Sequence, residues 1–344
     1  MTDARYWHFF ESIHPDADSC ELRLWVALPV NHSGQNVEIR DIFPEPEKIT
    51  TDSLTGNQII FWRFRDLKNK ERFYAYYDFK FVREPVISCV NPESIGGYDK
   101  ESEEYKRFTQ SEPWIEITDK IRSKAEEITK GETNPYRMAK RVFDWVTDNM
   151  VYEYPDQTKR GAANSFETLK GDCGEFSVVF CAMCRSLGIP ARTVTCVWLT
   201  DAGHQWAEIL MPGYGWMPVD ASTAQGLKGK SKAFLDEKNR IKSFADSRGM
   251  PTYDADWLYG NLYPERLIVA IGNNIKVDYP DLGISKTFLC IQPGGLFAMP
   301  PAFDAEGVST KPIQTGFYVF GEHSRDIDFA QNLATQKMAP SYIS

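Results

Sequence analysis

Three residues that together could break an amide bond follow one another in this 344-residue chain: Cys173, His204 and Asp220. A thiol becomes a nucleophile when it loses its proton, and an imidazole can take that proton and later give it to a leaving amine. A carboxylate fixes the imidazole tautomer and stabilises the imidazolium ion. Attack of the thiol on an amide carbonyl forms a thioester, which water or an amine then resolves. These residue types therefore predict acyl chemistry through a covalent intermediate.

A helix is expected to begin at Cys173, because apolar residues recur after it at three- and four-residue steps. Gly188 and Pro190 predict its end. Before it, Gly171 and Asp172 predict a turn that supplies an N-cap carboxylate. Cys173 then lies in the first turn, where the helix dipole favours a thiolate and backbone amides can stabilise an oxyanion. The apolar stripe consists of Phe176, Val179, Phe180, Met183 and Leu187.

Three β-rich runs after this helix predict where His204 and Asp220 lie. If the last two runs form a hairpin centred near residue 212, the position opposite His204 is Asp220. Directly opposed side chains have Cβ atoms roughly 4.5 to 5.5 Å apart, so this spacing brings the carboxylate to the imidazole. The runs are Arg192 to Leu199, His204 to Met211 and, after a Pro212-Gly213 turn, Trp216 to Asp220.

Four ordered motifs in this region resemble the core of the transglutaminase-like superfamily, and most of all its microbial branch described as candidate cysteine proteases. The close resemblance covers about residues 115–225. The motifs are Gly171-Asp172-Cys173-Gly174-Glu175-Phe176, Cys184-Arg185-Ser186-Leu187-Gly188-Ile189-Pro190-Ala191-Arg192, His204-Gln205-Trp206-Ala207-Glu208 and Gly215-Trp216-Met217-Pro218-Val219-Asp220.

The resemblance implies a papain-like core, in which a helix that carries the cysteine packs on an antiparallel sheet. It implies that Cys173 is the nucleophile, His204 the base and Asp220 the orienting acid. The family includes amine-transferring enzymes, peptide hydrolases, deglycosylating amidases and members without catalysis. The resemblance therefore indicates the triad more directly than the reaction.

The whole chain predicts an α+β protein of three parts, since single cores rarely exceed roughly 250 to 300 residues. Residues 1–95 read as an N-terminal antiparallel β-sandwich, residues 96–225 as the transglutaminase-like core, and residues 226–344 as an extension whose strands pack on the core. In the first part, strands separated by turn residues are expected at Cys20 to Val30, Val37 to Phe43, Gln58 to Phe64 and Phe73 to Val82. Aromatic residues of these strands are interpreted as packing residues.

Upstream of Cys173, two helices are expected, the first with a stripe at Ile121, Ala125 and Ile128 and the second with the N-cap pair Asn134-Pro135. Between them and Cys173, three residues could donate a hydrogen bond to an oxyanion, although packing or turn roles are favoured. They are Tyr152, Tyr154 and Asn164.

After Asp220, residues 225–250 show little periodicity and are interpreted as an insertion or a lid beside the cleft. Further strands are expected at Arg266 to Ile271 and Ile275 to Val277, and at Thr287 to Gln292 and Gly316 to Phe320. A helix is expected from Asp326.

The net charge of −9 is spread along the chain and argues against a nucleic-acid partner and against an anionic membrane surface. No apolar run is long enough for a signal peptide or a membrane span, so a cytoplasmic location is expected.

Seven cysteines, an odd number, favour a reducing compartment. Cys181 and Cys184 lack a second pair that would complete a zinc site and are interpreted as packing residues. Neither a metal nor a cofactor is expected. The remaining histidines are interpreted as surface or turn residues: His8, His14, His32 and His323.

The sequence favours a thiol-dependent amide hydrolase, a candidate cysteine peptidase that acts on a peptide or a peptide-like amide. Two alternatives remain open. One is an acyl transferase that uses an amine acceptor, and the other is a catalytically silent protein that binds a partner through the β domain. The absence of a calcium loop of the EF-hand kind favours hydrolysis. The oligomeric state is left open.

Overall fold

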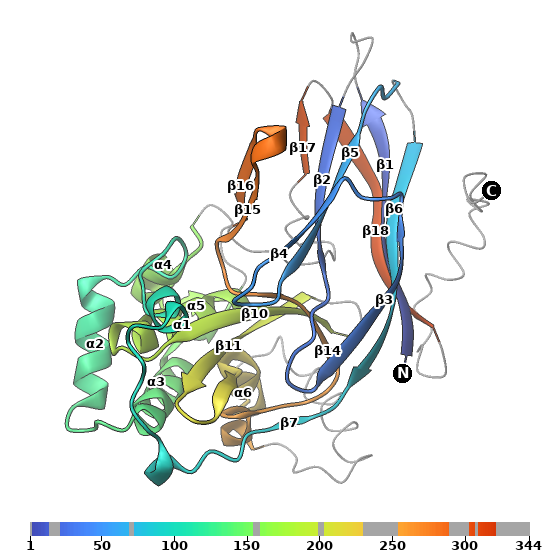
Figure 1. The fold of residues 1–344 in the computed structure, drawn as a ribbon. Coiled ribbons are helices and arrows are strands. Elements are labelled where there is room, and N and C mark those ends of the chain that lie inside the picture. Colours follow the sequence, from blue (N-terminus) through green and yellow to red (C-terminus); the bar gives the residue numbers. More distant parts are fainter. Residues whose placement is uncertain are drawn as a thin grey trace.

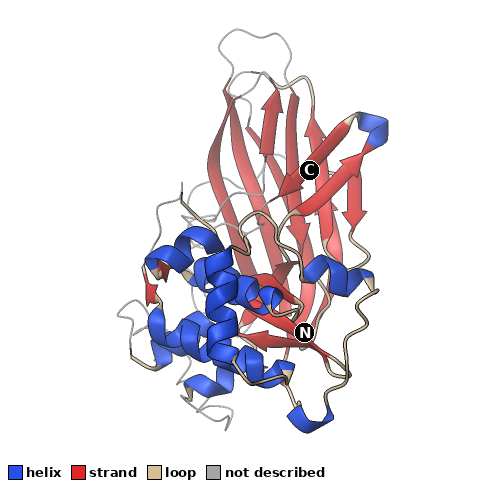
Figure 2. Ribbon diagram, turned by 90° about the vertical axis from the view of Figure 1, so that its left-hand side faces the viewer, coloured by secondary structure: helices blue, strands red, loops and turns tan. Residues whose placement is uncertain are grey.

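A computed structural model describes residues 2–13, 21–68, 72–153, 159–198, 203–229, 254–288, 303–306 and 309–320. It is a mixed α+β protein with antiparallel sheets, which confirms the predicted fold class. Helices gather at one end of the molecule, and long twisted strands rise from the other (Figures 1 and 2). Among the described residues, no helix is both long and apolar enough to cross a membrane.

The N-terminal part is a sandwich of two four-stranded antiparallel sheets, with strand orders β18-β1-β6-β3 and β17-β2-β5-β4. Tyr6, Leu24, Trp62 and Tyr77 lie in the buried cluster that the two sheets share. The strands expected from residue 20 to residue 82 are present, and their ends differ from the expected ones by at most two residues. The bounds are β1 Thr2–Ile13, β2 Glu21–Leu28, β3 Gln35–Phe43, β4 Lys48–Thr51, β5 Gln58–Phe64, β6 Arg72–Arg83, β17 Phe303–Glu306 and β18 Ser309–Phe320.

Two strands from the far end of the chain complete this sandwich. β18 pairs with β1 and β17 pairs with β2, both antiparallel. Figure 1 shows these orange-red strands among the blue ones. The last strands of the chain therefore lie against the N-terminal sheets. The division of the chain at residues 95 and 225 stays a prediction.

Six helices occur in the described residues, and polar side chains cap several of them. Asn134 accepts hydrogen bonds from the backbone amides of Tyr136 and Arg137, as its place before Pro135 predicts. Thr118 and Ser102 cap their helices in the same way. The bounds are α1 Glu103–Phe108, α2 Asp119–Thr129, α3 Pro135–Asn149, α4 Ala162–Thr168, α5 Cys173–Ser186 and α6 Ala221–Leu227.

The core sheet has the strand order β12-β11-β10-β14 and all its neighbours are antiparallel. Residues of β11 alternate between its faces. Ala207 and Ile209 pack with the apolar residues of α5, whereas Trp206 packs with Val30 of the N-terminal part. The sheet therefore lies between the helices and the sandwich. The bounds are β10 Ala191–Trp198, β11 Gly203–Met211, β12 Gly215–Val219 and β14 Arg266–Ile271.

Short elements connect these layers. The expected strand from residue 287 begins earlier, at residue 284, because it pairs with β15 in a hairpin closed by the turn at Gly283, which has a φ of 65°. The predicted lid beyond residue 229, residues 289–292 and the expected helix from Asp326 lie outside the described residues. The bounds are β7 Val86–Ile87, β8 Val151–Tyr152, β9 Lys170–Gly171, β13 Asn261–Leu262, β15 Ile275–Tyr279, β16 Ile284–Phe288, η1 Pro92–Ser94, η3 Ala255–Leu258 and η4 Pro280–Leu282.

Candidate active site

Cys173 is the first residue of α5, as the turn before it predicts. The Asp172 carboxylate accepts a hydrogen bond of 2.8 Å from the Gly174 amide and so caps the helix. The thiol lies against β11, where the backbone amide of Gln205 donates a hydrogen bond to the sulfur. Only 7% of Cys173 is exposed. The nucleophile candidate therefore lies between a helix start and the strand that carries His204.

The surroundings of Cys173 favour the neutral thiol, whereas the helix start alone was expected to favour a thiolate. Burial raises its pKa well above the usual value, and the carboxyl groups of Asp172, Asp220 and, once it is ionised, Glu175 raise it further. The Gln205 amide acts in the opposite direction. The helix dipole contributes only a partial charge at the N-terminus, so burial and three nearby carboxylates outweigh it.

His204 and Asp220 form a buried pair. The Nε2 atom of His204 lies 2.8 Å from Oδ2 of Asp220, and 2% of His204 and none of Asp220 is exposed. The sequence correctly predicted that these side chains meet, but the predicted hairpin register was wrong. Met211 pairs with Gly215, and Ala207 with Val219, so the hairpin is centred at residue 213.

The register differs because the turn is longer than expected. Residues 212–214 form it, the Tyr214 amide donates to the Met211 carbonyl, and both Gly213 and Gly215 have positive φ angles. Asp220 consequently lies just beyond the end of β12. Its side chain reaches His204 because the chain turns there into α6, which Asp220 caps by accepting from the Thr223 amide.

The Asp220 carboxylate has four more polar contacts besides His204. Arg266 lies 2.5 Å from Oδ2, and the Thr223 hydroxyl donates to the same oxygen at 2.8 Å. The Thr223 amide and the Ser222 hydroxyl donate to Oδ1 at 3.0 and 3.2 Å. Burial alone would raise the pKa of Asp220, but the charges of Arg266 and His204 and these hydrogen bonds lower it far below its usual value. Asp220 is therefore ionised.

Arg266 is the site residue that the sequence interpretation missed. It opens β14, it is fully buried, and its guanidinium lies 5.4 Å from the centroid of the Trp206 ring. The signal was present as a single charged residue at the start of the apolar run Arg266 to Ile271. Buried arginine is rare unless it is paired, so an arginine in this apolar run predicts a carboxylate partner.

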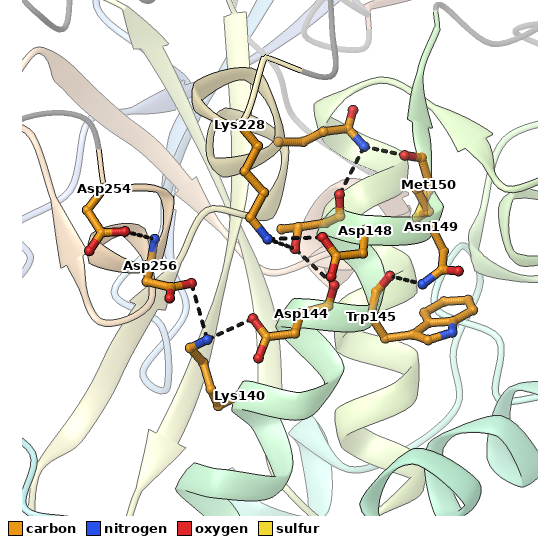
Figure 3. A network of polar contacts seen from close by, with 11 residues as sticks. Lys140, Asp144, Trp145, Asp148, Asn149, Met150, Lys228, Asp254 and Asp256 are labelled. Carbon is orange, nitrogen blue, oxygen red and sulfur yellow. Dashed lines mark hydrogen bonds and ion pairs between the residues drawn. The ribbon is translucent and has the colours of Figure 1, made fainter.

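A polar network holds α6, and with it the backbone that follows Asp220, against α3 (Figure 3). Lys228 donates to Asp148 and to the Thr147 hydroxyl, each at 3.1 Å. The amide of Gln225 donates to the Met150 carbonyl. A second lysine in the figure, Lys140, bridges Asp144 on α3 and Asp256 on η3. The carboxylate of the pair is therefore anchored to the helical layer as well as to the sheet.

A second buried ionic group lies on the sandwich side of the same sheet. Arg192 donates to Glu208 at 2.9 and 3.0 Å, and Nε2 of His32 lies 2.6 Å from the other carboxylate oxygen. The pKa of Glu208 is about 2, because the attraction of His32 and Arg192 outweighs the effect of burial. His32 was expected to be a surface or turn residue. It is in the turn between β2 and β3, but its ring is largely buried and contacts the core sheet.

The remaining sequence predictions have mixed outcomes. Cys181 and Cys184 are fully buried in α5, which confirms their packing role. The amide of Asn164 donates to the Lys159 carbonyl, and Tyr152 packs near Phe176, so both have the favoured structural roles. Tyr154, His14 and His323 lie outside the described residues. Within the described residues, no group of three or more His, Cys, Asp or Glu side chains is arranged to hold a metal ion.

A helix that begins with cysteine, packed on an antiparallel sheet that presents a His–carboxylate pair, defines the papain-like class of core. Residues 122–221 match the model of the transglutaminase-like superfamily. The resemblance read from the four motifs is therefore confirmed for this segment.

This chain is also similar to known proteins over part or most of its length. An uncharacterized protein of Haemophilus influenzae is 24% identical, over 82% of this chain and 87% of its own length. The uncharacterized protein YebA of Bacillus subtilis is 29% identical over 35% of this chain and 20% of its own length. The crystal structure of a candidate cysteine protease from Cytophaga hutchinsonii superposes with a TM-score of 0.52, covering 93% of both chains at 15% identity. This last similarity supports the fold.

Proposed function

We propose that this protein is a thiol-dependent amide hydrolase, a candidate cysteine peptidase, in which Cys173 is the nucleophile, His204 the base and Asp220 the orienting acid. The buried contact of 2.8 Å between His204 and Asp220, on the strand next to the first turn of α5, is the observation that carries the proposal. The transglutaminase-like match of residues 122–221 supports the same chemistry. The substrate class is a peptide or a peptide-like amide.

The first chemical step joins the sulfur to the substrate. Because Asp220 engages Nε2 of His204, the thiol proton passes to Nδ1 as the sulfur attacks the amide carbon. The carbonyl oxygen becomes an oxyanion. The backbone amide of Cys173 can donate to it, since amides of the first helical turn have no partner within the helix.

The second step releases the amine and then the acid. The imidazolium gives its proton to the amine nitrogen, the C–N bond breaks, and a thioester remains on Cys173. Water then loses a proton to His204 and attacks the thioester carbon. The C–S bond breaks, the thiolate regains its proton, and the carboxylic acid leaves.

The groups around Cys173 favour its neutral thiol before substrate binds. Arg266 lies 2.5 Å from Oδ2 of Asp220 and neutralises the charge of this carboxylate. Burial and nearby carboxylates keep the thiol protonated. The proton therefore moves from sulfur to nitrogen when the substrate carbonyl is in position, rather than before substrate binds.

A panel of fluorogenic peptides and peptide amides, incubated with and without a labelled primary amine, tests the proposal. Hydrolysis gives a free carboxylate that contains oxygen from ¹⁸O-labelled water, and added amine leaves the product unchanged. Incorporation of the amine would identify an acyl transferase instead.

Variants of Cys173 and of a second cysteine make the assignment specific. Cys173→Ala should abolish turnover, whereas Cys181→Ala, a change of another buried cysteine on the same helix, should preserve it. Failure of the wild-type protein to form a thioester with any activated ester probe would contradict the hydrolase assignment and favour a binding role.

A further inference from the structure

A single arginine holds the two carboxylates that flank the nucleophile. The Nη2 atom of Arg160 donates to both oxygens of Asp172, at 2.9 and 3.0 Å, and to Glu175 at 2.8 Å. The Nε atom donates to the other oxygen of Glu175 at 3.0 Å. Fork-shaped contacts of this kind fix orientation as well as charge. Arg160 lies before α4, so it ties that segment to the first turn of α5.

Asp172 and Glu175 also cap the helix reciprocally. The Asp172 side chain accepts from the Gly174 amide, and the Glu175 side chain accepts from the Asp172 amide. This is the capping-box arrangement, in which residues three apart satisfy each other's amides. Both carboxylates therefore have fixed positions on either side of Cys173.

Gly171 and Gly174 lack side chains, and this leaves room for the contacts between Arg160, Asp172 and Glu175. A Cβ atom at position 171 would lie 2.1 Å from the Glu175 Cβ. A Cβ atom at position 174 would lie 2.9 Å from Nη2 of Arg160. Neither position can take a side chain without displacing the contacts between Arg160 and the carboxylates. The local sequence is thus adapted to a buried arginine beside the nucleophile.

We propose that Arg160 is a positioning residue of the nucleophile: it fixes the first turn of α5 through Asp172 and Glu175 and offsets the negative charge that these carboxylates impose on Cys173. The proposal rests on Cys173 being the reactive thiol. Arg160 touches neither a substrate nor the reacting atoms in this role. Its effect reaches the sulfur through the helix start and through its charge.

The charges around Cys173 set the direction of the effect. Asp172 and Glu175 on the helix side and Asp220 on the sheet side oppose a thiolate, whereas Arg160 favours it. His204, which pairs with Asp220, is the base on the sheet side. Removal of the Arg160 charge therefore leaves the thiol facing three carboxylates, of which only Asp220 keeps a neutralising arginine.

The protonation of the Glu175 carboxyl group changes within the pH range of the alkylation experiment. Burial and its contact with Asp172 raise the pKa of Glu175 to about 8, although Arg160 acts to lower it. Below that pH, Glu175 carries its proton, and Arg160 and Asp172 form a neutral pair. Above it, one more negative charge lies beside Cys173 and opposes loss of the thiol proton.

The test measures the alkylation rate of Cys173 from pH 6 to pH 10.5 in the full-length protein, by mass spectrometry of the labelled peptide. Exposed Cys89 is the internal standard. Arg160→Gln should slow Cys173 alkylation about 10-fold near pH 8, because the loss of a neighbouring opposite charge shifts a pKa by roughly one unit or more. Arg160→Lys should recover part of the rate, since the charge returns without the fork. Lys159→Gln, which removes an exposed charge one residue away, is the matched control and should have no effect.

A double substitution separates electrostatics from folding. Glu175→Gln keeps the shape of the side chain and should speed alkylation above pH 8 but not below pH 7. In Arg160→Gln/Glu175→Gln, the rate should recover toward wild type at high pH, which a misfolded helix start would not allow. Equal rates in wild type and Arg160→Gln, with unchanged thermal unfolding, would overturn the proposal.

The same data keep this proposal distinct from the proposed function. If Arg160→Gln changes the Cys173 profile in a protein that hydrolyses no substrate, the positioning role stands and the hydrolase assignment fails. If wild type hydrolyses peptides and Arg160→Gln leaves both the profile and kcat unchanged, the hydrolase assignment stands and the positioning role is wrong.

Discussion

Replacing Arg266 by methionine would leave the Asp220 carboxylate buried without its cation. Both side chains are fully buried, and their charged atoms are 2.5 Å apart. Two unit charges about 4 Å apart attract each other by about 4 kcal/mol at an effective dielectric constant of about 20. Removing one partner of a buried pair typically costs about 3 to 5 kcal/mol. Since a domain is stable by only about 5 to 15 kcal/mol, Arg266→Met should lose a large part of the free energy of unfolding.

A double-mutant cycle with Asp220→Asn isolates the pair. Asp220→Asn leaves the guanidinium buried without its carboxylate and should cost a similar amount. The double variant removes both charges. Its loss of free energy of unfolding should be smaller than the sum of the losses in the two single variants, by at least about 2 kcal/mol. Urea unfolding followed by tryptophan fluorescence measures all four proteins at pH 7.

Arg192→Met is the matched control, because Arg192 pairs with buried Glu208 elsewhere on the same sheet. It should cost comparable stability but leave the turnover of the folded protein near wild type. Asp220→Asn should lower kcat strongly; in the serine-protease triad the equivalent change costs about 10⁴-fold. Additive losses in the Arg266–Asp220 cycle would refute the conclusion that these two charges stabilise each other.

Three further substitutions test other parts of the site. Cys173→Ala should abolish turnover but change the urea midpoint little, because it removes a single sulfur atom and leaves the Asp172 cap of the helix in place; a large loss of stability would contradict this. Glu175 has a raised pKa of about 8, so the unfolded chain releases this proton near pH 4.5 while the folded protein retains it. The stability that Glu175 contributes therefore falls as pH rises between these two values. In thermal unfolding, the stability of Glu175→Gln relative to wild type should increase from pH 5 to pH 8. A difference that does not change with pH would show that Glu175 ionises normally. Gly171→Ala should destabilise by about 1 to 3 kcal/mol and slow Cys173 alkylation, because the new Cβ meets the Glu175 side chain; wild-type behaviour would mean that the turn adjusts freely.

The first turn of α5 could be predicted from sequence because its signals are local. The N-cap aspartate, the first-turn cysteine and the apolar stripe after it lie within a few residues, and the pattern of one element carries them all. The same reasoning predicted the start of α3 at Pro135. Such elements depend on hydrogen bonds and spacing that neighbouring residues determine.

The hairpin register and the thiol protonation state could not be predicted in the same way. The hairpin is centred at residue 213 rather than at residue 212, which shifts the pairing of β11 and β12 by two positions, and turns of two or three residues both suit a Pro-Gly sequence. A register shift of two residues leaves each side chain on the same face of the sheet. The predicted contact between His204 and Asp220 is therefore present although the predicted register was wrong. The pKa of Cys173 depends on burial and on Asp220, which is 47 residues away in the chain. No pattern of neighbouring residues predicts the hairpin register or the pKa of Cys173.

The charge balance of the pair is a property of the whole fold rather than of the segment that carries its motifs. The superfamily match ends at residue 221, yet the cation that neutralises Asp220 comes from β14, beyond it. β14 is held in turn from the sandwich side, where Gln35 accepts from the Ile268 amide and donates to its carbonyl. Because buried ion pairs are stabilising only when every partner is held in place, the N-terminal sandwich and β14 are part of what keeps Asp220 ionised beside His204.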